Sequence, residues 1–288
     1  MLLQHIKNTF KDRSKALYVS LDNIWFTKNS LIELVNQFYA FGGTHLFVDE
    51  VHRYHLYGLS FREFLTMETN IDFPRFTLED IICNHMNIAT EITGKIKVLP
   101  EFKKYLEYGH YPFYREGATS YSLRLQNIVN TILDNDLPSV EKVEYNTLTS
   151  LSAEIETNRV SAIKYLGYLQ KAGLIKLLAP FGKGMNLMNK PEKIYLDNTN
   201  LIHSLAASNI NEGNLRETFF ANQCSANHKL TASKQGDFVI DDKYIFEVGG
   251  KGKNYKQIQN PENSFIAMDN IETGFGNKIP LWLFGFNY

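Results

Sequence analysis

A short apolar run that ends in two carboxylates constrains the fold of this 288-residue chain more than any other feature. The run Leu46-Phe47-Val48 leads directly into Asp49 and Glu50. An earlier apolar run, Ala16–Leu21, is separated from it by a helical pattern over residues 31–38. Continuously apolar strands joined by a helix indicate a βαβ unit, and therefore a parallel sheet covered on both faces.

Parallel sheets of this kind bind ligands at the carboxyl ends of their strands, where Asp22, Asp49 and Glu50 lie. In P-loop NTPases a strand-end Asp holds magnesium at the phosphates, and the next Glu can polarise the attacking water. The pair therefore predicts a nucleotide site, in which Asp49 binds Mg²⁺ through water and Glu50 is the catalytic residue. The alternative is a solvated acidic pair at an ordinary strand end. The chain contains no Gly-x-x-x-x-Gly-Lys-[Ser/Thr] loop, so we expect no ATP hydrolysis by these 288 residues alone.

Two patterns follow in the middle of the chain. Residues 61–135 predict a small helical bundle, because apolar residues recur there at helical spacing. Residues 146–196 predict a winged helix-turn-helix, with helices over 147–155 and 157–172. In this segment, the strands 174–178 and 193–196 flank a loop that contains glycines.

Cations on the predicted recognition helix and wing could bind DNA phosphates, which requires several of them on one face. They are Arg159, Lys164, Lys171, Lys183 and Lys190. Glu154, Glu156 and Glu192 lie nearby in the sequence. The alternative is therefore a packing or protein-interaction module that does not contact DNA.

The end of the chain predicts a third, α/β part. A helix that contains Glu217 precedes strands over 236–240, 243–248, 265–268 and 281–284.

Together these stretches resemble the prokaryotic AAA-plus ATPases that join an N-terminal P-loop domain to a winged helix and a nuclease-like domain of uncharacterised function. The stretches that carry the resemblance are Leu46–His52, Tyr57–Phe64, Leu166–Leu178 and Phe246–Val248. The resemblance implies an α/β protein with an incomplete AAA-plus core (1–65), a helical region (66–140), a winged helix (141–205) and an α/β nuclease-like domain (206–288). It also implies ATP and Mg²⁺ as cofactors, and self-association, because an arginine of one subunit can complete a neighbour's site.

The C-terminal part resembles the PD-(D/E)xK nuclease core. In that core an Asp and a Glu on paired strands bind magnesium, and a Lys two residues after the Glu assists the attacking water. The resemblance implies Asp237 and Glu247 as the metal ligands, with Glu217 on the preceding helix. Gly249 stands at the lysine position, and Lys251 follows two residues later. We therefore expect a retained fold with lost or altered chemistry.

Two departures from the family pattern concern the phosphate site. The family has a Walker A loop just before the helix that Met1 would continue, and further sheet between the positions of Tyr54 and His55. We expect that the sequence is either truncated or a joining of segments from a longer protein. A long Cα–Cα distance between Tyr54 and His55 would support the second possibility, since adjacent Cα atoms are about 3.8 Å apart.

Composition excludes several classes of protein. The net charge of −1, from 30 basic and 31 acidic residues, gives no overall attraction to nucleic acid or to an acidic membrane. Two cysteines, Cys83 and Cys224, are too few for a disulfide framework, and the histidines show no metal spacing. No apolar run reaches the roughly 18 residues of a membrane span, so we expect a cytoplasmic protein without a membrane partner.

Overall fold

The structure is a computed structural model, and it describes residues 15–20, 30–49, 57–136, 159–182, 191–206, 210–252 and 263–288. Contacts divide the chain into two compact units, Met1–Leu56 and Tyr57–Tyr288, which are described separately. Both units mix helices with strands, so the coarse prediction of an α/β protein is confirmed. In the described part of the chain, no helix is both long and apolar enough to cross a membrane.

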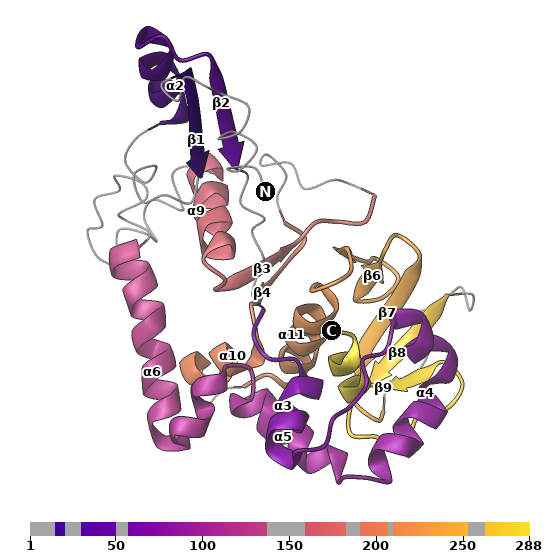
Figure 1. Cartoon of the computed structure of the whole chain (residues 1–288). Helices are drawn as coiled ribbons and strands as arrows, with labels where there is room; N and C mark the ends of the chain where they lie inside the picture. Colours follow the sequence, from indigo (N-terminus) through magenta and orange to yellow (C-terminus); the bar gives the residue numbers. More distant parts are fainter. Residues whose placement is uncertain are drawn as a thin grey trace. The chain divides into compact units, whose positions relative to one another are not determined.

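The first unit contains a βαβ arrangement. Strand β1 (Ala16–Ser20), helix α2 (Leu31–Ala40) and strand β2 (His45–Asp49) follow one another (Figure 1). The two strands pair in parallel and in register, so that Ser20 lies opposite Asp49. The predicted parallel pair joined by a helix is therefore confirmed. The predicted join between residues 54 and 55 lies outside the described residues.

Local sequence explains where α2 begins and ends. The Ser30 hydroxyl accepts a hydrogen bond from the Glu33 N–H (3.1 Å), and the Glu33 carboxylate accepts one from the Ser30 N–H (3.3 Å). This capping box satisfies two amides at the helix start. After the helix, Gly42 has φ +81°, a conformation that favours glycine. Gly43 lies so close to the Phe38 ring that a Cβ atom would come within 2.3 Å of it.

The second unit begins with the predicted helical region. Its elements are α3 (Phe61–Thr69), α4 (Leu78–Thr93), α5 (Val98–Tyr108), the 3₁₀ helix η3 (Pro112–Glu116), α6 (Ala118–Thr131) and the π-helical turn η4 (Ile132–Asp136). Capping boxes start α3 and α4, formed by Ser60 with Glu63 and by Thr77 with Asp80. The prediction of helices over residues 61–135 is confirmed.

A helix and a hairpin follow, as predicted for the second half of a winged helix. They are α9 (Arg159–Lys171) and the antiparallel strands β3 (Ile175–Leu178) and β4 (Lys193–Leu196). We call β3 and β4 the wing hairpin. The helix predicted over 147–155 lies outside the described residues. Helix α10 (Thr199–Ala206), which the sequence analysis did not predict, comes next.

The C-terminal part is a five-stranded mixed sheet preceded by α11 (Glu212–Cys224). Its strands are β5 (Leu230–Ala232), β6 (Phe238–Ile240), β7 (Tyr244–Gly249), β8 (Ser264–Met268) and β9 (Lys278–Pro280). They lie in sequence order, antiparallel from β5 to β7 and parallel from β7 to β9. The prediction of a strand over 281–284 is wrong, because these residues form the 3₁₀ helix η6 (Leu281–Phe286). A short apolar run buried on all sides suits either structure, so periodicity cannot separate them.

Helix α11 packs on one face of this sheet. The Phe220 ring of α11 lies 5.1 Å from the rings of Phe238 and of Phe246, which alternate with residues of the opposite face. The wing hairpin joins the sheet edge, because the Phe181 N–H donates to the Ala232 carbonyl (3.0 Å) just after β3.

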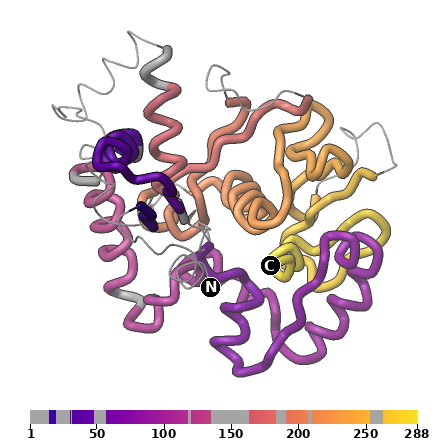
Figure 2. Tube along the Cα trace, turned by 45° about the horizontal axis from the view of Figure 1, so that its top comes forward, coloured from indigo at the N-terminus to yellow at the C-terminus, as the bar shows by residue number. Residues whose placement is uncertain are grey.

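One hydrophobic core connects the helical region, the wing hairpin and the sheet. The Phe61 ring lies 5.2 Å from Phe102, 5.5 Å from Tyr105 and 6.0 Å from Phe286. The C-terminal segment therefore packs against α3, as the tube in Figure 2 also shows. Residues 57–65, assigned from the sequence to the end of the ATPase core, belong instead to the second unit. The finer division of this unit into three parts remains a prediction.

Candidate functional site

The predicted nucleotide site belongs to the carboxyl edge of the strand pair in the first unit. Asp49 is the last residue of β2, and parallel pairing brings it beside Ser20 at the carboxyl edge. Glu50, the predicted catalytic residue, lies outside the described residues, as does Asp22. The backbone thus places Asp49 where ligands of parallel sheets bind.

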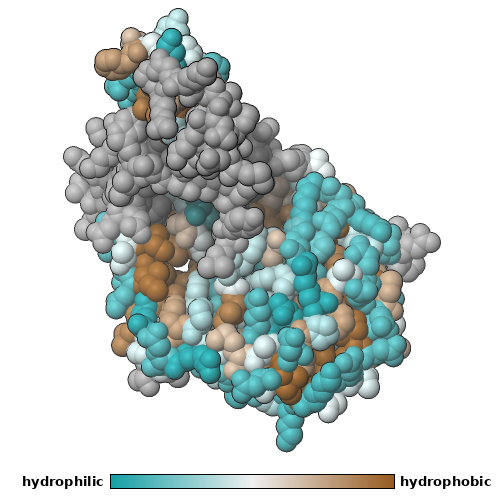
Figure 3. Space-filling model, in the orientation of Figure 1, coloured by the Kyte–Doolittle hydropathy of each residue, from teal (hydrophilic) through white to brown (hydrophobic). Residues whose placement is uncertain are grey.

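Three of the five predicted DNA-binding cations belong to helix α9. Lys164 and Lys171 are exposed on α9, and Arg159 is the first residue of that helix. Lys183 and Lys190 lie outside the described residues. The visible face of the second unit is largely hydrophilic, with smaller hydrophobic groups between (Figure 3).

The most developed polar cluster of the second unit joins the wing hairpin to the sheet. The Lys193 Nζ of β4 lies 3.1 Å from Glu217 Oε2 of α11 and 3.0 Å from Asp237 Oδ1, just before β6. The Tyr195 hydroxyl donates to the same Glu217 oxygen at 2.5 Å. We call Lys193, Tyr195, Glu217 and Asp237 the wing–sheet cluster. It contains two of the three predicted nuclease-like carboxylates.

Burial and charge act in opposite directions in the wing–sheet cluster. Lys193 keeps 27% of its side chain exposed, Glu217 keeps 24% and Asp237 keeps 15%. Burial opposes the charge of Lys193, but attraction to Asp237 and Glu217 outweighs burial and raises its pKa. Burial, followed by the hydrogen bond to Glu217, raises the pKa of Tyr195. The cluster is therefore a charged ammonium between two carboxylates, with a neutral phenol beside them.

The third predicted carboxylate belongs to Glu247, whose neighbour Val248 contacts this cluster through its backbone. The Val248 N–H, next to Glu247, donates to Asp237 Oδ2 at 2.9 Å. Glu247 lies within β7, is 4% exposed and pairs in register with Ile266 of β8. Asp237, which directly precedes β6, and Glu247 of β7 thus lie close together, as the resemblance implies. Gly249 ends β7, so the usual lysine is missing there.

The cluster does not fit a bound magnesium ion. Mg²⁺ requires oxygen ligands about 2.0–2.1 Å away in a near-octahedral arrangement. In the wing–sheet cluster an ammonium already separates the two carboxylates. Among the residues that the structure describes, no group of three or more His, Cys, Asp or Glu side chains could hold a metal ion.

The sequence analysis missed Lys193 and Tyr195. They are 44 and 22 residues from Asp237 and Glu217, respectively, so no local motif links them. One signal was available in β4, where Lys193 and Tyr195 alternate with Ile194 and Leu196. Alternation places the lysine and tyrosine on one face of the strand.

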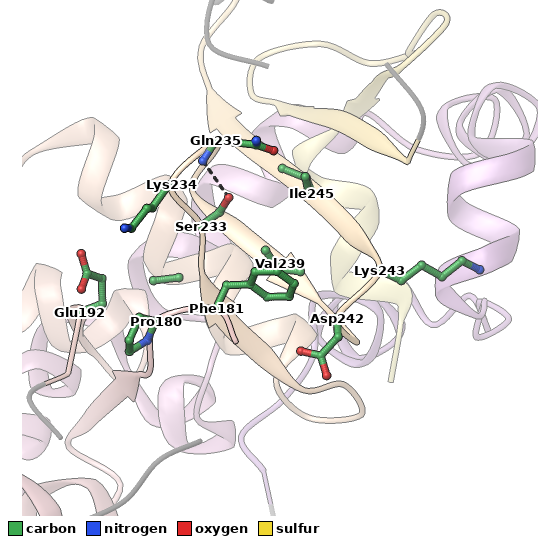
Figure 4. A pocket seen from close by; sticks show the side chains of 11 residues that line it. Pro180, Phe181, Glu192, Ser233, Lys234, Gln235, Val239, Asp242, Lys243 and Ile245 are labelled. Carbon is green, nitrogen blue, oxygen red and sulfur yellow. Dashed lines mark hydrogen bonds between the residues drawn. The ribbon is translucent and has the colours of Figure 1, made fainter. Parts of the chain in front are cut away.

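A pocket of about 380 Å³ lies between the end of β3 and the sheet. Its apolar wall includes Pro180, Phe181 and Val239 (Figure 4). Glu192 and Asp242 contribute acidic groups, and Lys234 and Lys243 contribute basic ones. Because the charges balance, the lining selects neither an anion nor a cation.

Comparison of the chain with protein-family models, with curated proteins and with solved structures found no match. The functional argument therefore rests on the residues of this chain and on their geometry.

Proposed function

We propose that the protein is an AAA-plus type ATPase whose nucleotide site lies at the carboxyl ends of β1 and β2. In this proposal Asp49 holds Mg²⁺ through water and Glu50 activates the attacking water. The observation that carries it is the parallel register, which ends both strands at one edge with Ser20 beside Asp49. A bound Mg²⁺·ATP would supply the phosphoryl group, and the chain's carboxylates would orient the ion and the water.

Binding of a fluorescent ATP analogue, with and without Mg²⁺, tests this proposal. We expect weak, magnesium-dependent binding that Asp49→Asn abolishes. We expect no ATP turnover, because no glycine-rich loop with a lysine is available to hold the β- and γ-phosphates. Asp72→Asn, a matched change at an exposed position of the second unit, should leave binding unchanged. The proposal is refuted if the wild-type and Asp49→Asn proteins bind the analogue equally.

A second candidate function belongs to the second unit, namely a protein-interaction adaptor rather than a DNA reader. The observation that favours it is the pairing of both described lysines of the wing hairpin with carboxylates. Lys176 lies 3.4 Å from Asp197, and Lys193 is held by the wing–sheet cluster. Cations that are neutralised within the protein release no counterions from DNA, so they add little affinity.

The salt dependence of binding to duplex DNA separates the adaptor from a DNA reader. Lys164 and Lys171 remain exposed on α9, and a spacing of seven residues places them on one face. Two phosphate contacts give a slope of about −1.8 in log K against log salt. We expect no DNA binding, or weak binding with a slope no steeper than about −2. A slope of about −4 or steeper, which requires roughly four or more phosphate contacts, would overturn the adaptor proposal.

A further inference from the structure

We propose that the ammonium group of Lys193 is the resident cation of the carboxylate site, and that it holds the wing hairpin on the sheet where a nuclease-like core would hold magnesium. This inference goes beyond the ATPase proposal and does not depend on it.

The distances in the cluster suit an ammonium and not a metal ion. The two contacts of Lys193 Nζ, 3.1 Å to Glu217 and 3.0 Å to Asp237, have the length of ordinary N–H···O hydrogen bonds. A magnesium ion at the same point would be about 1 Å too far from each oxygen. One ammonium and two carboxylates leave one negative charge, and the Tyr195 hydroxyl donates to the oxygen of Glu217 that Lys193 also contacts.

The aromatic side of the cluster also favours an organic cation. Lys193 Nζ lies 5.2 Å from the centroid of the Phe238 ring. The face of an aromatic ring attracts an ammonium group, and this attraction grows as water is removed. The same ring offers no oxygen to Mg²⁺, which needs several oxygen or water ligands.

The position of Lys193 in the chain explains how it holds the wing hairpin on the sheet. Its strand, β4, belongs to the wing hairpin, whereas Glu217 belongs to α11 and Asp237 directly precedes β6. Hydrogen bonds between Ala232 and the residues after β3 make a further link between hairpin and sheet: the Ala232 N–H donates to the Ala179 carbonyl (2.9 Å). Loss of the Lys193 ammonium would remove both contacts that join β4 to Glu217 and Asp237, which weakens this junction.

Titration with Mn²⁺, a paramagnetic substitute for Mg²⁺, tests the inference in the full chain. We expect Lys193→Met to bind one more Mn²⁺ than the wild type does. We also expect its melting temperature to fall by at least ~3 °C and to recover when Mn²⁺ is added. Lys176→Met is the matched control, since it removes the other ion pair of the hairpin, at 3.4 Å from Asp197, and leaves the carboxylate site closed. It should bind no more Mn²⁺ than the wild type.

Two results would overturn the inference. One is a Mn²⁺ site in the wild type that Asp237→Asn removes, because the site would then hold a metal beside Lys193. The other is a folded Lys193→Met protein with no additional Mn²⁺ bound. The wild-type titration remains decisive if Lys193→Met does not fold. Counting differences between variants also separates this site from any Mn²⁺ bound at Asp49, so failure of the ATPase proposal would not affect the outcome.

Discussion

Gln223 connects three parts of the second unit in the core, and its replacement offers a stringent test of the fold. The side chain is fully buried in α11. Its Oε1 accepts a hydrogen bond from the Phe61 N–H (3.2 Å), and its Nε2 donates to the Tyr105 hydroxyl (2.9 Å). Nε2 also lies 3.4 Å from the hydroxyl of Tyr288, the last residue of the chain.

Gln223→Met keeps the length of the side chain but removes these hydrogen bonds and the one that Nε2 donates to Asn222 Oδ1 (2.7 Å). The Phe61 N–H is the first amide of α3, so it has no partner within the helix and would be left unsatisfied in the core. That loss costs about 1–3 kcal/mol. Tyr105 still donates to the Leu59 carbonyl at 2.6 Å, so its loss is limited to about 1 kcal/mol. The expected total, about 2–4 kcal/mol, lowers the melting temperature by roughly 5–15 °C for a domain of this size.

Urea unfolding followed by circular dichroism and by tryptophan fluorescence, to which the buried Trp282 contributes, measures this change. Gln235→Met is the matched control, because Gln235 is exposed and its replacement leaves the core intact. Tyr288→Phe combined with Gln223→Met should be less destabilising than the sum of the two changes, because the residues share one network. An unfolding midpoint of Gln223→Met equal to that of Gln235→Met would refute the reasoning.

Two further predictions concern buried ionisable groups. Burial lowers the pKa of His110 to about 4. Between about pH 6.5 and pH 4 the unfolded chain therefore binds a proton at this residue while the folded chain does not. The free energy of unfolding has its full value above pH 6.5 and falls by about 3 kcal/mol as the pH drops through that window. His110→Gln should flatten this part of a stability–pH profile measured by urea unfolding, and an unchanged profile would contradict the assignment. Burial also raises the pKa of the Cys224 thiol, whereas Cys83 is exposed. A thiol reagent at pH 8 should therefore label Cys83 alone in the folded protein and both cysteines after unfolding, and rapid labelling of both in the folded state would contradict the described core.

The sequence predicts those parts of the fold that depend on local patterns. Apolar periodicity and a capping serine are enough to place α2 between two strands, and Gly173 with φ +72° ends α9 before the hairpin. Periodicity fails at residues 281–284, where packing against α3 and α11 and not local preference selects a 3₁₀ helix. Helix α10 also escaped prediction, although its buried side includes Leu201 and Ile202, because its eight residues are too few for a clear period.

In the candidate site, too, the sequence predicts some residues and misses others. The resemblance implies that Asp237 and Glu247 lie close together, and the hairpin of β6 and β7, which the sequence also predicts, brings them near each other. Lys193 comes from another hairpin, and only the tertiary structure brings its ammonium between Glu217 and Asp237. A sequence motif can thus predict that carboxylates meet, but the cation that neutralises them depends on contacts between distant segments.

The stretch Tyr57–Phe64, one of the four that carry the resemblance to AAA-plus ATPases, has a structural explanation in the second unit. Tyr288 donates to the Gly58 carbonyl at 3.0 Å, and the Leu59 N–H donates to the His110 carbonyl at 2.7 Å. A Cβ atom on Gly58 would lie 2.2 Å from His110 Nε2, so only glycine fits there.

The residues that follow are equally constrained. Ser60 and Glu63 form the capping box of α3, Phe61 fills the core, and Arg62 Nε donates to the Tyr288 carbonyl at 3.1 Å. Packing and capping therefore account for these residue types. The stretch begins the second unit, and its contacts stabilise the fold of that unit. The nucleotide proposal depends instead on Asp49, Glu50 and the strands that end beside them.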